Sequence, residues 1–242
     1  MNMQSIIEII KSIDTDFPNV NPTELYNEGW MTRLLTSQSF NEKTKLEGLD
    51  FGKIINWTSE ALISSPFVKA VESREGYTHA DIALGDFKVD YEKRGEIIIL
   101  DKAKIFGIIE AKMGSNLSKG TKHFSDYNQA SRNLACICSQ TYNKECEIFF
   151  IVVAPHKQLL KHKIEKQINL QFMIQQIKER FKNYLESFKS SQNMNLILSK
   201  AETCVVRALS YEEWIEAIVN SDSKDFIKDF YMKAKKWNRI KD

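Results

Sequence analysis

The spacing of apolar residues changes several times along the chain, and each change marks an expected element. Gln4 to Lys11 carries the three-to-four spacing of an amphipathic helix. Asn21-Pro22-Thr23 opens a second expected helix, which runs to about Ser37, because proline is tolerated in the first turn of a helix. Its expected core contacts are Leu25, Met31, Leu34 and Leu35.

The middle of the chain is rich in β-branched residues and predicts strands. Tyr77 to Val89 alternates loosely between apolar and polar positions. Glu96 to Leu100 and Lys104 to Met113 are rich in isoleucine, and the tetrad DKAK at their junction fits a hairpin turn. Glu147 to Ala154 is a continuous apolar run and predicts a buried strand, which Pro155 stops.

Helical spacing surrounds that last strand. Phe124 to Cys138 predicts a helix with one shared side made of Phe124, Tyr127, Ser131, Leu134 and Cys138. A long lysine-rich helix is expected from Gln158 to Lys189. A short strand (Thr203 to Ala208) and two helices (Tyr211 to Val219 and Asp225 to Lys236) follow.

This order of elements predicts an α/β fold, in which helices flank a mixed central sheet. The chain has no strong linker, so we expect one domain over residues 1–242. Its core would span residues 21–155, and residues 156–242 would form a mostly helical C-terminal extension.

Composition narrows the class of protein. The chain has 242 residues, of which 43% are hydrophobic and 27% charged, which is typical of a globular protein. The longest apolar run, Ile148 to Ala154, is far shorter than the ~20 residues that a bilayer requires, so no membrane partner is expected. The start lacks the basic region of a secretory signal, and the four cysteines show no C-x-x-C spacing. We therefore expect reduced thiols in a cytoplasmic protein.

The net charge of +2 is unevenly distributed. Residues 1–156 have a balance of −4, and residues 157–242 a balance of +6. The lysine-rich half could simply present solvated helix faces, or it could form a basic surface that attracts phosphate. Charge alone does not separate these two interpretations.

Candidate chemistry lies at the end of the apolar segment IFGIIEAKM. Alternation along a strand puts Phe106, Ile108, Glu110 and Lys112 on one face, and Ile105, Ile109 and Ala111 on the other. A buried charge is costly unless it is paired or holds a metal. The simplest interpretation is a Glu110–Lys112 ion pair at a strand end, half in solvent.

A second carboxylate changes this interpretation. Asp81 interrupts the strand-like run THADIAL, although aspartate is disfavoured inside strands. If this strand neighbours the Glu110 strand, two carboxylates converge beside Lys112 and repel each other. A divalent cation would remove the repulsion, and two carboxylates, a backbone carbonyl and waters suit Mg²⁺.

Asp81, followed by Glu110-Ala111-Lys112 on a buried strand, a helix and an apolar strand, resembles the PD-(D/E)xK nuclease superfamily, which has the restriction-endonuclease-like fold. The resemblance covers approximately Asn21 to Pro155 and implies an αβββαβ core. It implies that Asp81 and Glu110 ligate Mg²⁺ (Mn²⁺ is an alternative), that the Ala111 carbonyl can also ligate, and that Lys112 is the catalytic lysine. It further assigns Glu28, on the preceding helix, and Gln129, on the following helix beside Arg132, to the site.

The sequence departs from the family pattern in two places. Ala80, not proline, precedes Asp81, and the interval to Glu110 is longer than a simple hairpin needs. Asp86 and Asp101 are therefore reserves for the first acidic ligand, although Asp86 follows Gly85 and is more easily explained as a turn residue. His79 would share a face with Asp81 and could contact a phosphate, or it could simply pack at a sheet edge.

The resemblance predicts a metal-dependent nuclease that hydrolyses phosphodiester bonds, with DNA a better candidate than RNA and with a homodimer compatible with its relatives. The alternative is a catalytically inactive module of the same fold that binds nucleic acid or protein. Further nucleic-acid contacts could come from the polar loop Gly114 to Lys122, which is not a P-loop, and from three aromatic residues among the C-terminal lysines. These are Trp214, Tyr231 and Trp237, although aromatic residues at helical spacing are more often core residues.

Overall fold

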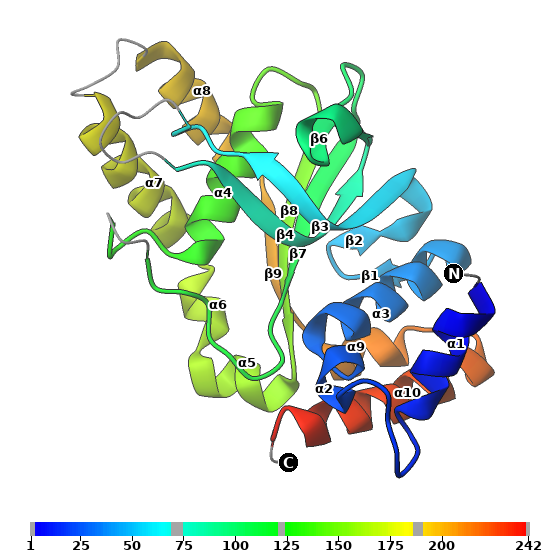
Figure 1. Cartoon of the computed structure of the whole chain (residues 1–242). Helices are drawn as coiled ribbons and strands as arrows, with labels where there is room; N and C mark the ends of the chain where they lie inside the picture. The colour runs from blue at the N-terminus through cyan, green and yellow to red at the C-terminus, as the bar shows by residue number, and fades with distance from the viewer. Residues whose placement is uncertain (1–2, 69–74, 121–123, 186–190, 241–242) are drawn as a thin grey trace.

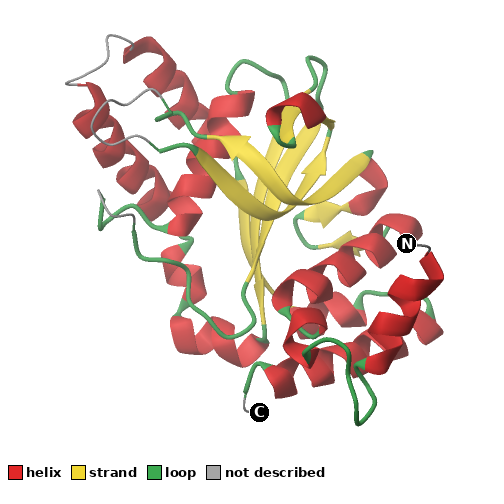
Figure 2. Ribbon diagram, in the orientation of Figure 1, coloured by secondary structure: helices red, strands yellow, loops and turns green. Residues whose placement is uncertain are grey.

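The computed structural model of the chain describes residues 3–68, 75–120, 124–185 and 191–240 (Figure 1). A seven-stranded mixed sheet lies between two groups of helices (Figure 2), so the predicted α/β class is confirmed. In spatial order the strands are β5 (Phe87–Asp90), β6 (Glu96–Ile99), β3 (Asn56–Ser64), β4 (Tyr77–Gly85), β7 (Ile105–Ala111), β8 (Glu147–Ala154) and β9 (Val205–Ser210). A separate short hairpin joins β1 (Lys45–Leu46) to β2 (Leu49–Asp50).

Strand direction divides the sheet. β4 runs antiparallel to both β3 and β7, whereas β7, β8 and β9 are mutually parallel. β8 sits in the interior of the parallel part, and all of its residues except Glu147 are buried, as its apolar run predicts. Because β9 pairs with β8, the C-terminal part of the chain contributes a strand to the central sheet.

The expected hairpin between Glu96–Leu100 and Lys104–Met113 is wrong. β6 and β7 are not neighbours, because β3 and β4 lie between them. β6 instead pairs antiparallel with β5, in the register Phe87 to Ile99, and parallel with β3. The tetrad DKAK therefore begins a connection across the sheet, in which the carboxylate of Asp86 accepts the Lys104 N–H at 2.6 Å.

Two groups of helices cover the sheet. One face carries α4 (Gln129–Thr141), α5 (His156–His162), α6 (Ile164–Gln167), α7 (Leu170–Leu185) and α8 (Ser191–Glu202). The other carries α1 (Met3–Ser12), α2 (Pro22–Leu25), α3 (Glu28–Glu42), α9 (Tyr211–Glu216) and α10 (Ser221–Trp237). Single 3-10 turns cover Phe51–Lys53 and Tyr91–Lys93. Among the helices of the described ranges, none combines the length and apolar composition needed to cross a bilayer.

The second expected helix is two helices. α2 ends at Leu25, and the side chain of Asn27 then accepts the Trp30 N–H at 3.0 Å and caps the start of α3. Met31 and Leu35 are fully buried as predicted, while Leu25 and Leu34 pack at the edge of the core. The break matters because it puts Glu28 in the first turn of α3.

Two further helix boundaries differ from expectation. α4 begins at Gln129 because the side chain of Asn128 accepts the Ser131 N–H, so Phe124 and Tyr127 precede the helix. The long lysine-rich helix is broken into α5, α6 and α7, first at Lys163, whose φ of 50° is left-handed. Residues 186–190 of that expected helix lie outside the described ranges, and α8 is an element that no pattern predicted.

Two hydrophobic cores lie on opposite faces of the sheet. The α4-side core contains Phe106 and Ile108, and the α3-side core contains Ile105, Ile109 and Ala111. The predicted alternation of β7 is therefore confirmed, and it directs the Glu110 side chain toward α4.

Candidate active site

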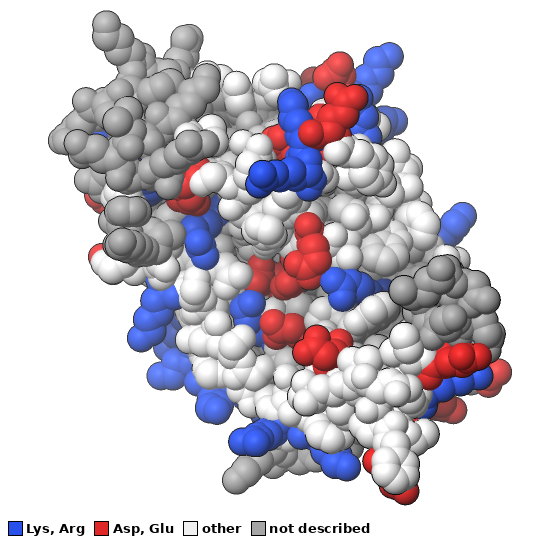
Figure 3. Space-filling model, in the orientation of Figure 1, with Lys and Arg blue, Asp and Glu red and all other residues white. Residues whose placement is uncertain are grey.

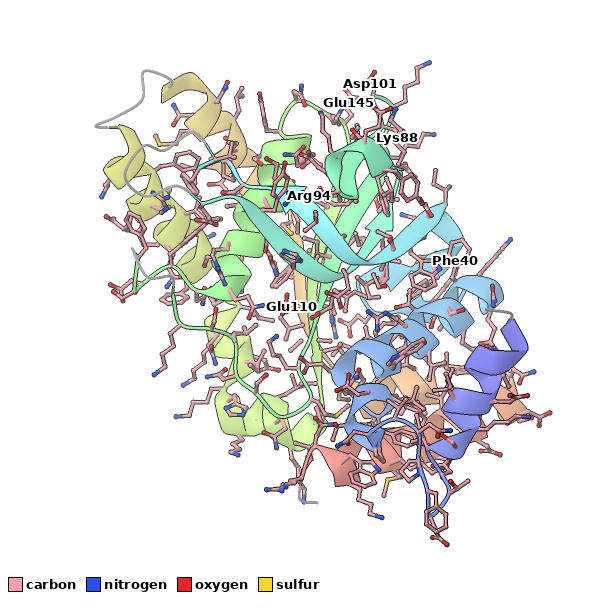
Figure 4. All side chains as sticks on the ribbon, viewed as in Figure 1. Phe40, Lys88, Arg94, Asp101, Glu110 and Glu145 are labelled. Carbon is pink, nitrogen blue, oxygen red and sulfur yellow. The ribbon has the colours of Figure 1, made fainter. Side chains whose placement is uncertain are left out.

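Glu110 and Lys112 form a buried ion pair at the end of β7. Their Oε1 and Nζ atoms lie 2.7 Å apart, and the residues are only 1% and 8% exposed. The expected pair half in solvent is thus wrong: both charges are withdrawn from water, which is tolerable only with close partners. Figure 4 labels Glu110 near the middle of the molecule, close to α4.

Asp81 faces Glu110 across the β4–β7 pair. The ladder ends where Ile82 pairs with Ile109, and Asp81 and Glu110 are the next residues of the two strands. At this step the Asp81 side chain replaces the backbone acceptor, because its Oδ2 accepts the Ala111 N–H at 2.7 Å. The predicted convergence of the two carboxylates is present.

The alternation of β3 and β4 restarts at this point. In β3, Trp57 packs against the α3-side core but Ala61 belongs to the α4-side core, although both are odd-numbered. In β4, Ala80 lies in the α4-side core and Ile82 in the α3-side core. The registers Ser59 to Ile82 and Ala61 to Ala80 flank the break.

The residues at the break are Glu60 and Asp81. Glu60 has a left-handed φ of 53°, which is rare for a side chain inside a strand, and its carboxylate pairs with Arg33 at 3.1 Å. The irregularity explains how aspartate occupies a strand interior: the backbone ladder with β7 ends at Ile82, and the Asp81 side chain bonds the next free N–H of β7 instead.

Two amides from α4 complete the surroundings of Glu110. Gln129 Nε2 donates to Glu110 Oε1 at 2.5 Å, and Asn133 Nδ2 donates to Oε2 at 2.9 Å. Thr78 in turn donates to the Asn133 side-chain oxygen at 2.6 Å. Gln129 was predicted, while Asn133 and Thr78 were missed. The available signal was that Asn133 lies four residues after Gln129, on the same helix face.

Glu28 approaches from the other face of the sheet. Its Oε2 accepts the Met113 N–H at 2.7 Å, which ties the first turn of α3 to the chain just after Lys112. The structure therefore brings Glu28 to the predicted neighbourhood. Arg132 does not reach Glu110; its guanidinium donates to Ser118 Oγ at 3.0 Å.

The reserve carboxylates lie elsewhere. Asp86 accepts the Lys104 and Ile105 N–H groups at the opposite end of β7, as a turn residue would. Asp101 is exposed, pairs with Lys144 at 3.4 Å and is labelled at the far end of the sheet in Figure 4. Asp81 is the acidic residue that the fold brings opposite Glu110. His79 is exposed on β4.

The C-terminal aromatic residues belong mainly to the core. Trp214 is fully buried and donates its indole N–H to Ser39 at 2.8 Å, and Tyr231 is 5% exposed. Trp237 is the member of the three that is exposed, and Lys236 lies over its ring. The interpretation of these aromatic residues as core residues is therefore confirmed for two of the three.

Burial is the largest influence on the pKa values of the cluster. Burial, reinforced by the charge of Asp81 and opposed by Lys112, raises the pKa of Glu110 to about 7. Burial likewise raises the pKa of Asp81. Burial disfavours the charge of Lys112 as well, but the neighbouring Glu110, Glu28 and Asp81 outweigh it and raise the lysine pKa. The lysine stays charged, whereas the carboxylates compete to remain ionised.

The oxygen atoms around Asp81 and Glu110 fit a hard cation that takes few of its ligands from the protein. Within the described ranges, no three or more His, Cys, Asp and Glu side chains are grouped so as to hold a metal by themselves. Mg²⁺ usually binds one or two carboxylates and keeps several waters. The N–H and C=O of one strand residue point the same way, so the Ala111 carbonyl faces the side of Asp81. Two opposed carboxylates and this carbonyl make a ligand set of that size.

Comparisons with protein-family models, with curated proteins and with solved structures find no match to this chain. The arrangement of Asp81, Glu110 and Lys112 must therefore carry the functional argument. Figure 3 shows acidic side chains gathered near the middle of the face in view, with lysine and arginine along its lower left border. An acidic centre beside a basic border suits a cation that meets a polyanion.

Proposed function

We propose that this protein is a metal-dependent nuclease that hydrolyses phosphodiester bonds, with DNA as the expected substrate. The observation that carries the proposal is the position of Asp81 at the end of the β4–β7 ladder, where its Oδ2 accepts the Ala111 N–H beside Glu110, while Lys112 Nζ lies 2.7 Å from Glu110 Oε1. A carboxyl group whose pKa is raised by burial and by a neighbouring carboxylate, beside a charged lysine, is typical of catalytic sites. The PD-(D/E)xK resemblance rests on these same three residues.

The order of elements around the site supports the restriction-endonuclease-like part of the proposal. α3, β3, β4, β7, α4 and β8 occur in the order αβββαβ, with the β1–β2 hairpin inserted between α3 and β3 and the short β5 and β6 between β4 and β7. This insertion accounts for the long interval between Asp81 and Glu110. The acidic pair therefore sits on adjacent strands despite its separation in sequence.

Each residue then has a defined task. Asp81, Glu110 and the Ala111 carbonyl would hold Mg²⁺ or Mn²⁺, which when bound polarises a phosphate oxygen and makes a bound water more acidic. Lys112 would hold and orient the attacking water and offset negative charge that develops on the phosphate. Gln129 and Asn133 fix the orientation of Glu110, as partners of metal ligands usually do.

A catalytically inactive binding module is the second candidate. Both Glu110 oxygens already accept hydrogen bonds within the chain, from Lys112, Gln129 and Asn133. A purely structural cluster needs the same hydrogen bonds, because an unpaired buried carboxylate is costly. The two candidates differ in whether the cluster binds a divalent cation and cleaves.

Cleavage of plasmid DNA, single-stranded DNA and RNA in Mg²⁺, Mn²⁺ or EDTA tests the proposal. We expect cutting of DNA by the wild type with either metal, and loss of at least ~100-fold for Glu110→Ala and for Lys112→Ala. Asp101→Asn is the matched control, because this carboxylate is exposed and far from the site. Cutting that survives both active-site variants, or that persists in EDTA, would leave the binding module as the better account.

A further inference from the structure

A polar pocket opens next to the acidic cluster. It has a volume of about 480 Å³, within the range of small-molecule sites. Four segments line it: the start of α3, the loop after β7, helix α5 and the C-terminal segment after α10. Glu28 and Gly114 are shared between this lining and the surroundings of Lys112, so the pocket begins where the proposed catalytic site ends.

The C-terminal wall of the pocket is firmly positioned. Asn238 donates its side-chain N–H groups to the carbonyls of Tyr26 and Ala234 at 2.9 and 2.8 Å. A side chain at Gly114 would lie 2.7 Å from Ile240 Cδ1, so the glycine lets this segment pack directly on the loop after β7. These contacts present Arg239 beside the loop.

Gln158 is the unusual group in the lining. It is 7% exposed, and its Oε1 atom is buried with no hydrogen-bond partner among the described residues. Buried polar side-chain atoms nearly always have a partner, and an unsatisfied one costs about 1–3 kcal/mol. A ligand in the pocket that donates a hydrogen bond would satisfy Gln158.

The charged groups of the pocket favour an anion at one wall. Lys161 and Arg239 line it, and neither has an ion pair within the residues that the structure describes. Glu28 lies at the wall nearest the acidic cluster, where Met113 donates to its carboxylate. An anion would therefore sit toward Lys161 and Arg239 and away from Glu28.

We propose that this pocket binds one nucleotide of the substrate strand next to the phosphodiester that is cleaved. The nucleotide phosphate pairs with Lys161 and Arg239, and its base donates a hydrogen bond to Gln158 Oε1. The inference deepens the proposed function and rests on its nucleic-acid substrate. The continuity of the pocket with Glu28 and Gly114 places this nucleotide beside the reacting phosphate.

The test measures binding separately from cleavage. A fluorescein-labelled single-stranded oligodeoxynucleotide of mixed sequence is titrated with protein in Ca²⁺, and a gel checks that it stays intact. Fluorescence anisotropy then gives Kd for the wild type and for Gln158→Leu, Lys161→Glu and Lys157→Glu. Lys157 is the matched control, because it is exposed on the same helix and does not line the pocket.

We expect Kd to rise about tenfold for Lys161→Glu and about fivefold for Gln158→Leu, relative to Lys157→Glu. Thermal melting checks that each variant is folded. The inference is overturned if either variant binds as tightly as Lys157→Glu, or if the wild type does not bind the oligonucleotide. Pocket-dependent binding without any cleavage would overturn the nuclease and keep the nucleotide site, so the two failures are distinguishable.

Discussion

Glu110 shows how a carboxylate can be withdrawn from water without losing all of its partners. Its two oxygens accept from Lys112, just after its own strand, and from Gln129 and Asn133 on α4. These donors come from elements already rigidified by the core, which keeps the carboxylate oriented. The remaining conflict is with Asp81, because like charges at short range disfavour simultaneous ionisation.

This conflict predicts the pH dependence of stability in EDTA. The pKa of Glu110 is about 7 in the folded protein and near 4.5 when unfolded. The unfolded carboxyl therefore loses its proton first as pH rises, so its contribution to stability is full below about pH 4.5 and is lost by about pH 7. The side chain introduced by Glu110→Gln does not titrate. Relative to that variant, the free energy of unfolding of the wild type should fall by on the order of 2 kcal/mol between about pH 5 and pH 8.

Urea unfolding of both proteins at the two pH values measures this difference. Glu145→Gln, on an exposed loop, is the control and should follow the wild type at both pH values. If the free energies of unfolding of the wild type and of Glu110→Gln change equally with pH, then ionising Glu110 does not destabilise the folded protein. That result would contradict the burial and repulsion described above.

At the scale of elements, the site depends on close packing of β7 between β4 and β8. Gly107 lies in the centre of β7, and a Cβ there would lie 2.4 Å from both the Phe149 ring and the Phe149 carbonyl oxygen. Side chains cannot approach a backbone oxygen so closely, so the strands must separate to admit one. This glycine lets β7 hold Glu110 against its neighbours.

Gly107→Ala is therefore expected to lower the free energy of unfolding by about 1–3 kcal/mol. Gly76→Ala is the matched control, because no atom lies within 4 Å of the position its Cβ would take, and it should change stability by less than about 0.5 kcal/mol. Chemical denaturation measures both. Equal stability of the two variants would show that a side chain at position 107 fits beside Phe149 without strain.

At the scale of the whole molecule, the acidic cluster lies where the sheet meets both helical groups. Glu28 comes from α3, Asp81 from β4, Glu110 from β7 and Gln129 from α4. A cation bound by the two carboxylates would bridge β4 and β7, and thus stabilise the folded chain as a whole. A homodimer remains a prediction, since the structure contains one chain.

Divalent metal should therefore raise the melting temperature. A ligand at a hundred times its Kd adds about 2.7 kcal/mol, which corresponds to about 5–10 °C for a chain of this length. We expect Mg²⁺ or Mn²⁺ to produce such a rise in the wild type and in Asp101→Asn, EDTA to reverse it, and Glu110→Ala to lack it. Differential scanning fluorimetry provides the measurement. A rise of the same size in Glu110→Ala would mean that the metal binds elsewhere.

The sequence alone determined features that depend on local pattern. The apolar run of β8 is long enough to require a buried strand, and the isoleucine-rich end of β7 directs Glu110 and Lys112 to one face by simple alternation. The α/β class and the pairing of Glu110 with Lys112 followed from these patterns. Helix boundaries were less accurate, because single caps such as Asn27 and Asn128 divide runs of similar composition.

Only the tertiary structure decided which distant segments meet. In the sheet, β3 and β4 lie between β6 and β7, so Asp81, and not Asp86 or Asp101, lies beside Glu110. The left-handed φ of Glu60 coincides with a change in side-chain alternation that no local pattern reveals. Asn133 and Gln158 acquire their roles only through packing of α4 and α5 against other elements. Local spacing reports period and burial, whereas strand neighbours and pocket walls result from long-range contacts that minimise the energy of the whole fold.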